Sequence, residues 1–240
     1  MYSRNKRHAH WVVRAMELTG KKFLVVGASG VLGAELTRQL QDKGATVLGT
    51  ARSNETAGNI PAKVEIRLLL DYESPESVKT LTDYLLASSE IDGIINASGV
   101  VAFGEASALD SATITRLMAV NASGPMQLVS ALQPLLAKKD ESVVVNLTGV
   151  VAETPLPGIA AYSASKCAID GFLTGVTREW RRAGTRVISA RPGHTETGLA
   201  GRAIAGEAPK FPQGMTAEHV AEKIVTAIES DEKELPASAF

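Results

Sequence analysis

Short apolar segments alternate with segments of helical pattern along the 240-residue chain, and this alternation restricts the fold more than any other feature. The apolar segments predict strands at residues 22–26, 46–50, 64–70, 91–95, 142–147 and 186–190. The helical segments cover residues 34–41, 75–87, 107–121, 124–137, 160–182 and 216–229. The strand segments are continuously apolar, which is typical of strands covered on both faces. We therefore expect an α/β fold built on one doubly wound parallel sheet, with helices on both faces.

A glycine-rich turn, Gly27-Ala28-Ser29-Gly30-Val31-Leu32-Gly33, joins the first predicted strand to the first predicted helix. Glycines let the backbone approach a pyrophosphate, and a helix N-terminus offers unpaired N–H groups and a favourable dipole. The alternative is a tight turn that only packs the helix against the strand. The predicted dinucleotide contacts are Gly27, Ser29, Gly30, Val31, Leu32 and Gly33.

Arg52 follows the second predicted strand, where NAD-binding sites place a carboxylate that accepts from the ribose hydroxyls. No acid is present there. An arginine can instead pair with a 2′-phosphate, which favours NADP as the cofactor and leaves NAD as the second choice. The alternative is an ordinary solvated arginine in a loop.

The third and fourth predicted strands also end in candidate contacts. Asp71 can contact the adenine or cap the loop that follows it. Ligands bind at the carboxyl edge of such sheets, and small residues there allow a nucleotide to lie against the backbone. The candidates at the end of the fourth strand are Asn96, Ala97 and Ser98.

Tyr162 and Lys166 lie four residues apart in a predicted helix and therefore share one face. A fixed ammonium favours the phenolate and lowers the phenol pKa from about 10 toward the working pH. Such a tyrosine can give a proton to a developing alkoxide or take one from an alcohol. By itself, the pair also fits a partly buried tyrosine beside a solvated lysine.

Composition argues against several other classes of protein. The net charge of −1 gives no reason to expect a nucleic-acid partner. The longest uncharged run, residues 117–137, contains polar and helix-breaking residues, so we expect no membrane span. The single cysteine, Cys167, fits a reducing cytoplasm. No group of side chains has the spacing of metal ligands, so we expect no metal.

Residues 1–15 form a basic segment that contains four arginine or lysine residues and no acid. We expect a flexible extension there, followed by one domain at residues 16–240. The alternative is an arm that binds nucleic acid. Residues 194–215 hold four glycines and two prolines, and predict a long mobile loop over the substrate.

Together these motifs resemble the short-chain dehydrogenase/reductase family. The matching positions occur in the family's order from about residue 18 to the C-terminus: 27–33, Asp71, Asn96–Gly99, Asn121, Tyr162, Lys166, Pro192-Gly193 and Thr197. The resemblance implies a compact, single-domain, Rossmann-like enzyme that assembles as a homodimer or homotetramer through the helices at 124–137 and 160–182.

The resemblance also implies roles for the matched residues. Tyr162 is then the general acid/base, and Lys166 lowers the pKa of Tyr162 and holds the nicotinamide ribose. Asn121 anchors a water in a proton relay, or simply ties a helix to a strand as a buried amide. The residues expected to flank the nicotinamide are Pro192, Gly193, Thr195 and Thr197.

The chain departs from the family's pattern at two points. The middle glycine of the turn comes one residue early, with Val31 at the usual place. Gly149 stands where the family carries a serine that donates to the substrate oxygen. Thr148, one position earlier, and His194, after Pro192-Gly193, are the candidates to replace that donor; His194 also fits a plain surface histidine.

The sequence therefore predicts an oxidoreductase that transfers a hydride between NADP(H) and a carbonyl or secondary alcohol, with Tyr162 as general acid/base. The alternative is an NADP-binding regulatory or redox-sensing protein with little catalytic activity, favoured by Gly149 and the unusual glycine spacing.

Overall fold

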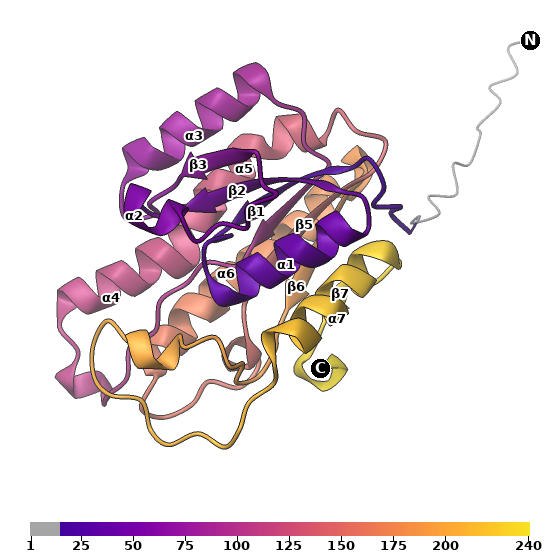
Figure 1. The fold of residues 1–240 in the computed structure, drawn as a ribbon. Helices are drawn as coiled ribbons and strands as arrows, with labels where there is room; N and C mark the ends of the chain where they lie inside the picture. The colour runs from indigo at the N-terminus through magenta and orange to yellow at the C-terminus, as the bar shows by residue number, and fades with distance from the viewer. Residues whose placement is uncertain (1–14) are drawn as a thin grey trace, which may run out of the picture.

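The computed structural model describes residues 15–240, so the predicted basic segment at 1–15 lies outside the described residues except for Ala15. The described chain has the α/β architecture that the sequence predicts, a central sheet between two layers of helices (Figure 1).

Seven strands form one sheet in the order β3-β2-β1-β4-β5-β6-β7, and every neighbouring pair is parallel. The order reverses between β1 and β4, which is the point where open parallel sheets bind ligands. The strands are β1 (Lys22–Val26), β2 (Thr46–Ala51), β3 (Ile66–Leu69), β4 (Gly93–Asn96), β5 (Ser142–Leu147), β6 (Thr185–Ala190) and β7 (Glu234–Leu235).

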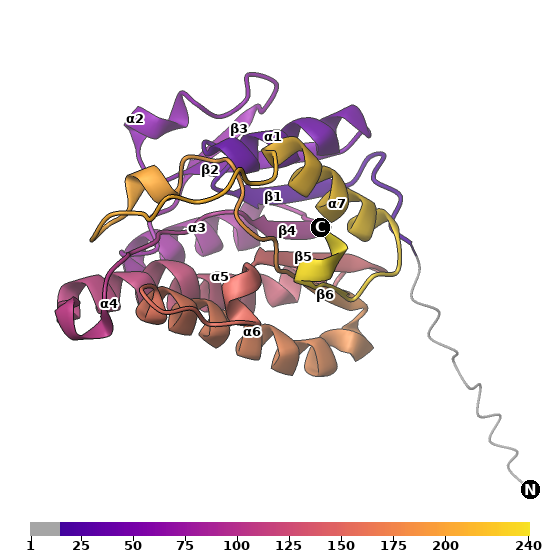
Figure 2. The same cartoon turned by 90° about the horizontal axis from the view of Figure 1, so that it is seen from below.

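Helices cover both faces of the sheet, as Figure 2 shows from below. One apolar core lies between the sheet and α1 and α7, and a second lies between the sheet and α3, α5 and α6. This two-sided burial explains why the inner strands are continuously apolar, whereas the edge strand β3 is mostly exposed. The α-helices are α1 (Val31–Asp42), α2 (Asn54–Ala57), α3 (Pro75–Ser88), α4 (Ser111–Met118), α5 (Gly124–Leu136), α6 (Ala160–Trp180) and α7 (Ala217–Glu229).

A π-helical turn at Ala119–Ser123 joins α4 to α5, so the two predicted helices at 107–121 and 124–137 form one continuous helical run. A π turn is rare and is found mostly at functional sites. Gly124 follows it, where a Cβ would come within 2.5 Å of the Tyr72 ring. The absence of a side chain at Gly124 therefore lets the loop after β3 pack against the helix.

The long loop predicted at 194–215 is irregular apart from a short 3₁₀ turn at Ala200–Arg202. Its two ends are joined by a bridge between Thr195 and Met215. The loop ends at Thr216, whose side chain accepts from the backbone N–H of His219 and starts α7. Within residues 15–240, no helix has the length and apolar character needed to cross a membrane.

Candidate active site

The glycine turn between β1 and α1 is packed against the end of β4. Gly27 has a φ of +79°, and a Cβ at this residue would lie 3.2 Å from the Ser98 backbone. The N–H of Gly30 donates to Gly27 O at 2.9 Å and closes the turn. Gly33 is buried directly against Gly27 O, where no Cβ fits. The spacing of the three glycines therefore follows from close backbone contacts.

The N-terminus of α1 is open toward this turn. Gly30 is the N-cap and supplies no side-chain hydrogen bond, so the first N–H groups of the helix have no side-chain partner. Ser29 is half-buried, Val31 is 51% exposed and Leu32 is buried in the core. The end of the helix thus has the free donors and positive dipole that bind a phosphate.

Arg52 and Asp71 follow the two strands on that side of the sheet. The side chain of Arg52 is exposed directly after β2. The Asp71 carboxylate accepts from the N–H of Glu73 at 2.9 Å, and the N–H of Asp71 donates to Ser77 Oγ at 3.0 Å. Asp71 therefore caps the loop after β3, and its contact with the adenine stays a prediction.

A buried polar network fixes the end of β4. Asn96 Nδ2 donates to Asn146 Oδ1 at 2.6 Å, and Asn96 Oδ1 accepts from Ser98 Oγ at 2.8 Å. The Tyr72 hydroxyl also donates to Asn96 Oδ1, at 3.4 Å, and burial raises the pKa of this phenol. Tyr72 and Asn146 are not among the residues predicted from sequence. Asn146 could have been found, because it lies two residues before Thr148 and therefore on the same side of the strand.

Asn121 lies inside the π turn and ties three segments together. Its Nδ2 donates to Val100 O at 2.8 Å and to Ser165 Oγ at 3.0 Å, and its Oδ1 accepts from the N–H of Val100 at 2.9 Å. Ser165 Oγ in turn donates to Tyr162 O at 2.7 Å. The amide therefore links the loop after β4 to the helix that carries Tyr162, as one of its two expected roles requires.

Tyr162 and Lys166 lie on one face of α6, with the lysine Nζ 5.9 Å from the tyrosine ring centroid. Lys166 is 6% exposed, and its Nζ donates to Leu147 O at 2.8 Å. A Cβ on Gly99 would lie 3.1 Å from Asn121 Oδ1 and 3.5 Å from Lys166 Nζ. The structure thus gathers Gly99, Asn121 and Lys166, and with them Tyr162, at the carboxyl edge of β4 and β5.

The pKa values of this pair differ from the expectation. Burial raises the pKa of Tyr162 to about 12, and burial lowers the pKa of Lys166 to about 8. Desolvation disfavours the charged form of each group, and here it outweighs the attraction of an ammonium for a phenolate. The expected lowering of the tyrosine pKa by the lysine is therefore wrong for the chain alone.

A family model described as short chain dehydrogenase matches residues 21–208. The chain belongs to this family. Among its relatives are an uncharacterized oxidoreductase, YbbO, of Escherichia coli (29% identical, covering 75% of this chain and 69% of the relative) and a dehydrogenase/reductase SDR family protein 7-like of Anopheles gambiae (27% identical, 92% and 76%). Among solved structures, a short-chain dehydrogenase of Burkholderia cenocepacia in complex with NADP is 25% identical, with a TM-score of 0.81, covering 92% of this chain and 89% of that one.

Thr148 in this short-chain dehydrogenase does not reach the site. Its side chain is fully buried, and Thr148 Oγ1 lies 2.8 Å from Ser189 Oγ and 3.3 Å from Ala190 O. A buried hydroxyl that is already bonded has no access to a substrate oxygen, so the expectation that Thr148 replaces the family serine is corrected. Ser189 also donates to Asp170, which pairs with Arg191, and sequence reasoning missed all three residues.

Gly149 adopts a backbone conformation that only glycine takes readily, with φ +78° and ψ 158°. A Cβ here would meet no atom closer than Pro192 O at 3.7 Å. The N–H of the next residue, Val150, donates to Pro192 O at 2.9 Å. The structure therefore brings Gly149 beside the Pro192-Gly193 segment, as the site requires.

His194 and the threonines that follow it belong to the base of the long loop. Thr195 Oγ1 donates to Gly193 O at 3.0 Å, and the N–H of Thr197 donates to Thr195 O at 2.8 Å. His194 Nε2 lies 3.5 Å from Glu196 Oε1, and the imidazole stacks on the Phe211 ring at 4.7 Å. One ring nitrogen and one ring face of His194 are therefore engaged by other residues of the same loop, Glu196 and Phe211.

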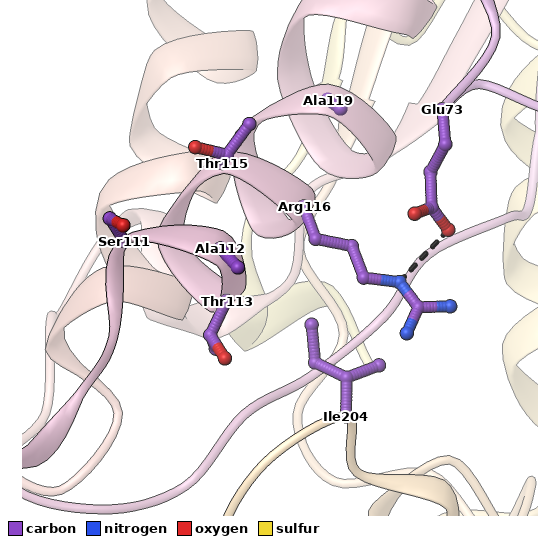
Figure 3. Close-up of a pocket in the computed structure, with 8 residues that line it drawn as sticks. All are labelled: Glu73, Ser111, Ala112, Thr113, Thr115, Arg116, Ala119 and Ile204. Carbon is purple, nitrogen blue, oxygen red and sulfur yellow. Dashed lines mark hydrogen bonds and ion pairs between the residues drawn. The ribbon is translucent and has the colours of Figure 1, made fainter.

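A pocket of about 470 Å³ lies apart from the predicted site residues, between α4, the loop after β3 and Ile204 of the long loop (Figure 3). Arg116 Nε donates to Glu73 Oε1 across it at 2.9 Å. The residues that line it include none of the predicted contacts, so we do not place the chemistry there. Among residues 15–240, no group of three or more His, Cys, Asp or Glu side chains is arranged to hold a metal ion.

Proposed function

We propose that this protein is an NADP-dependent oxidoreductase that interconverts a carbonyl compound and a secondary alcohol. The observation that carries the proposal is that Asn121 Oδ1 and Lys166 Nζ both border Gly99, at 3.1 Å and 3.5 Å from where its Cβ would lie, with Lys166 one helical turn from Tyr162. Membership of the short-chain dehydrogenase family agrees with this chemistry.

The residues present fit a dinucleotide. At Gly30, the uncapped N-terminus of α1, a Cβ would meet only Gly27 O at 3.4 Å, so the backbone there is open to a pyrophosphate. Arg52, exposed after β2, would bind the 2′-phosphate that distinguishes NADP. Asn96, Ala97 and Ser98 would lie beside the adenosine, and Lys166 would hold the nicotinamide ribose. Pro192, Gly193, Thr195 and Thr197 would flank the nicotinamide.

The bound nicotinamide supplies the hydride, and the chain's own residues supply the proton and the geometry. With a pKa of about 12, Tyr162 is protonated at neutral pH and donates from its hydroxyl to the substrate oxygen as negative charge develops there. Lys166 and Asn121 hold the helix and the loop after β4 at fixed positions around that oxygen.

The test is turnover of a panel of ketones and aldehydes with NADPH, followed by absorbance, for the wild type and for Tyr162→Phe. We expect the variant to lose at least 99% of its kcat and to keep its affinity for NADPH. Tyr84→Phe is the matched control, because Tyr84 lies exposed on α3. Turnover that survives Tyr162→Phe contradicts the proposed proton transfer.

A second function, NADP-dependent regulation or redox sensing without turnover, is favoured by one observation. Gly149 stands at the family's serine position, and the adjacent Thr148 hydroxyl is bonded inside the core. Loss of one oxyanion donor costs about 10²- to 10³-fold in kcat. Tight binding of NADPH without turnover of any carbonyl compound in the panel would support this alternative.

We also propose that the protein forms a homodimer or homotetramer through the outer faces of α5 and α6. These faces carry small or partly buried residues, including Ser130, Gly171, Phe172 and Gly175, around a shallow groove. Light scattering after size-exclusion chromatography would give the mass directly, and Gly175→Arg should lower it to that of a monomer.

A further inference from the structure

Three aromatic side chains from two distant parts of the chain meet at the outer end of the site. The His194 and Phe211 rings stack, with centroids 4.7 Å apart and planes inclined by 25°. Phe103 and Phe211 meet at 6.1 Å with an inclination of 50°. We call Phe103, His194 and Phe211 the aromatic cluster. The cluster was not visible in the sequence, because residues 194–215 contain one Phe, Tyr or Trp, Phe211, and Phe103 lies in a distant part of the chain.

The chain segments that carry Phe103 and His194 both start beside the proposed catalytic residues. The segment that carries Phe103 begins at Gly99 and Val100, which contact Lys166 and Asn121. The segment that carries His194 begins at Pro192, whose carbonyl accepts from the N–H of Val150 at 2.9 Å. Both segments therefore run outward from the reacting centre and converge on Phe211.

Backbone hydrogen bonds hold the long loop over this region. The N–H of Ile204 donates to Val101 O at 2.8 Å, and the N–H of Phe103 donates to Ala205 O at 2.9 Å. The N–H of Gly104 donates to Gly158 O at 2.8 Å, which adds the loop after β5 to the same wall. Three loops that follow β4, β5 and β6 are thus joined around the aromatic cluster.

The cluster is only partly covered by protein. Phe103 is 6% exposed, whereas Phe211 is 41% exposed, and Leu156, in the loop joined to Gly104, is 45% exposed. The exposed parts of Phe211 and Leu156 leave apolar surface that a ligand can cover. The carboxylate of Glu196 is already engaged by His194 and by the N–H of Gly214. The rings of the cluster and Leu156 therefore offer apolar and aromatic surface to a ligand.

We propose that the aromatic cluster binds the organic group next to the reacting carbon, and that the substrate is a neutral ketone bearing an aromatic or other bulky apolar ring, or the corresponding alcohol. This inference rests on the proposed function, because it assigns the substrate class of the same site. Stacked and edge-to-face rings give such a group both buried area and a preferred orientation.

The experiment compares acetophenone, cyclohexyl methyl ketone and 2-butanone as substrates with NADPH, for the wild type, Phe211→Ala and Phe211→Leu. For Phe211→Ala we expect the ratio of KM for acetophenone to KM for 2-butanone to rise at least fivefold. Phe211→Leu should restore part of the loss with cyclohexyl methyl ketone and less with acetophenone. Tyr84→Ala is the matched control, because Tyr84 is 44% exposed on α3, and it should leave all ratios within twofold of the wild type.

An equal rise in KM for all three ketones, or no rise for acetophenone, overturns the assignment of substrate class. If no variant turns over any ketone, the proposed function fails, and binding then decides the role of the cluster. In that case saturation-transfer NMR of acetophenone with the protein–NADPH complex should lose its signal in Phe211→Ala and keep it in Tyr84→Ala. A signal that survives Phe211→Ala contradicts the proposal.

Discussion

Arg191 donates to both carboxylate oxygens of Asp170, with Nε 3.1 Å from Oδ1 and Nη2 3.2 Å from Oδ2. The two side chains are only 13% and 18% exposed. Asp170 also accepts from Ser189, whose hydroxyl bonds Thr148. The pair thus joins α6 to the residues that directly precede Pro192 and Gly149.

Asp170→Asn should lower the free energy of unfolding by about 2–3 kcal/mol, because it leaves a largely buried guanidinium without its bidentate partner. The matched control is Glu234→Gln, since Glu234 pairs with the same arginine at 3.3 Å but is 64% exposed. That exposed pair is worth about 0–1 kcal/mol. Urea unfolding of both variants checks the prediction, and equal losses would contradict it.

Lys166 should make stability depend on pH between about 8 and 10. Its pKa is lowered by burial from 10.5 to about 8, so in that range the unfolded chain binds a proton that the folded chain has released. The free energy of unfolding therefore rises with pH there, by up to about 1.4 kcal/mol per pH unit from this group. Below pH 8 the full penalty of burying the charge is present.

Lys166→Met removes this group and keeps the aliphatic stem. Urea unfolding at pH 7, 8, 9 and 10 should show the wild type gaining stability relative to the variant as pH rises above 8. The pKa of Tyr162 is raised to about 12, so its ionisation affects stability only above pH 10, outside the pH range of this experiment. A difference between the two proteins that stays constant from pH 7 to 10 would show that Lys166 titrates normally.

Gly149→Ala should destabilise the fold by about 1–3 kcal/mol, because its φ of +78° is strained for any residue with a Cβ. Gly58→Ala is the control. Gly58 has a φ of −62° and open space around it, so alanine there should be neutral or stabilise by up to about 1 kcal/mol. Thermal unfolding of the two variants measures the contrast.

Gly149→Ser should have a kcat at least about tenfold above that of Gly149→Ala. The two variants carry the same backbone strain, and only serine adds a hydroxyl where the family places a donor to the substrate oxygen. Comparison with alanine, rather than with the wild type, separates the chemistry of the hydroxyl from the cost of the Cβ. Equal kcat values would mean that a hydroxyl at 149 does not reach the substrate.

Arg52→Ala should weaken the binding of NADPH at least tenfold and that of NADH less than twofold, because only NADPH carries the 2′-phosphate. Arg67→Ala is the control, since Arg67 lies on the neighbouring strand β3 and donates to Val64 O. Titration calorimetry with both cofactors measures the effect. Equal losses for NADPH and NADH would remove Arg52 from the phosphate site.

The six predicted strands all occur, within two residues at each end. In all but β3, burial leaves a clear apolar signal, whereas β3 lies mostly exposed at the edge of the sheet. β7 was missed, since Glu234 and Leu235 become a strand only by pairing with Ser189 and Ala190. The sequence predicted two separate helices, at 107–121 and 124–137, whereas a π turn carries the helix through.

At the site, the glycine turn and the Tyr162/Lys166 pair were visible because each motif is local in sequence. The environment of Thr148 was not visible, because its hydroxyl bonds Ser189, 41 residues away. The pKa values of Tyr162 and Lys166 were missed for a related reason: their shifts come from burial by the whole fold, which four-residue spacing does not report.

The outermost strand β7 is two residues long and is followed at once by Pro236, which has no N–H to donate. A longer bare strand would offer a ladder of unpaired groups to any passing chain. At β7, a strand from another chain could pair with two residues only, because Pro236 then interrupts the hydrogen bonds. This edge of the sheet is therefore a poor template for pairing with the sheet of another molecule.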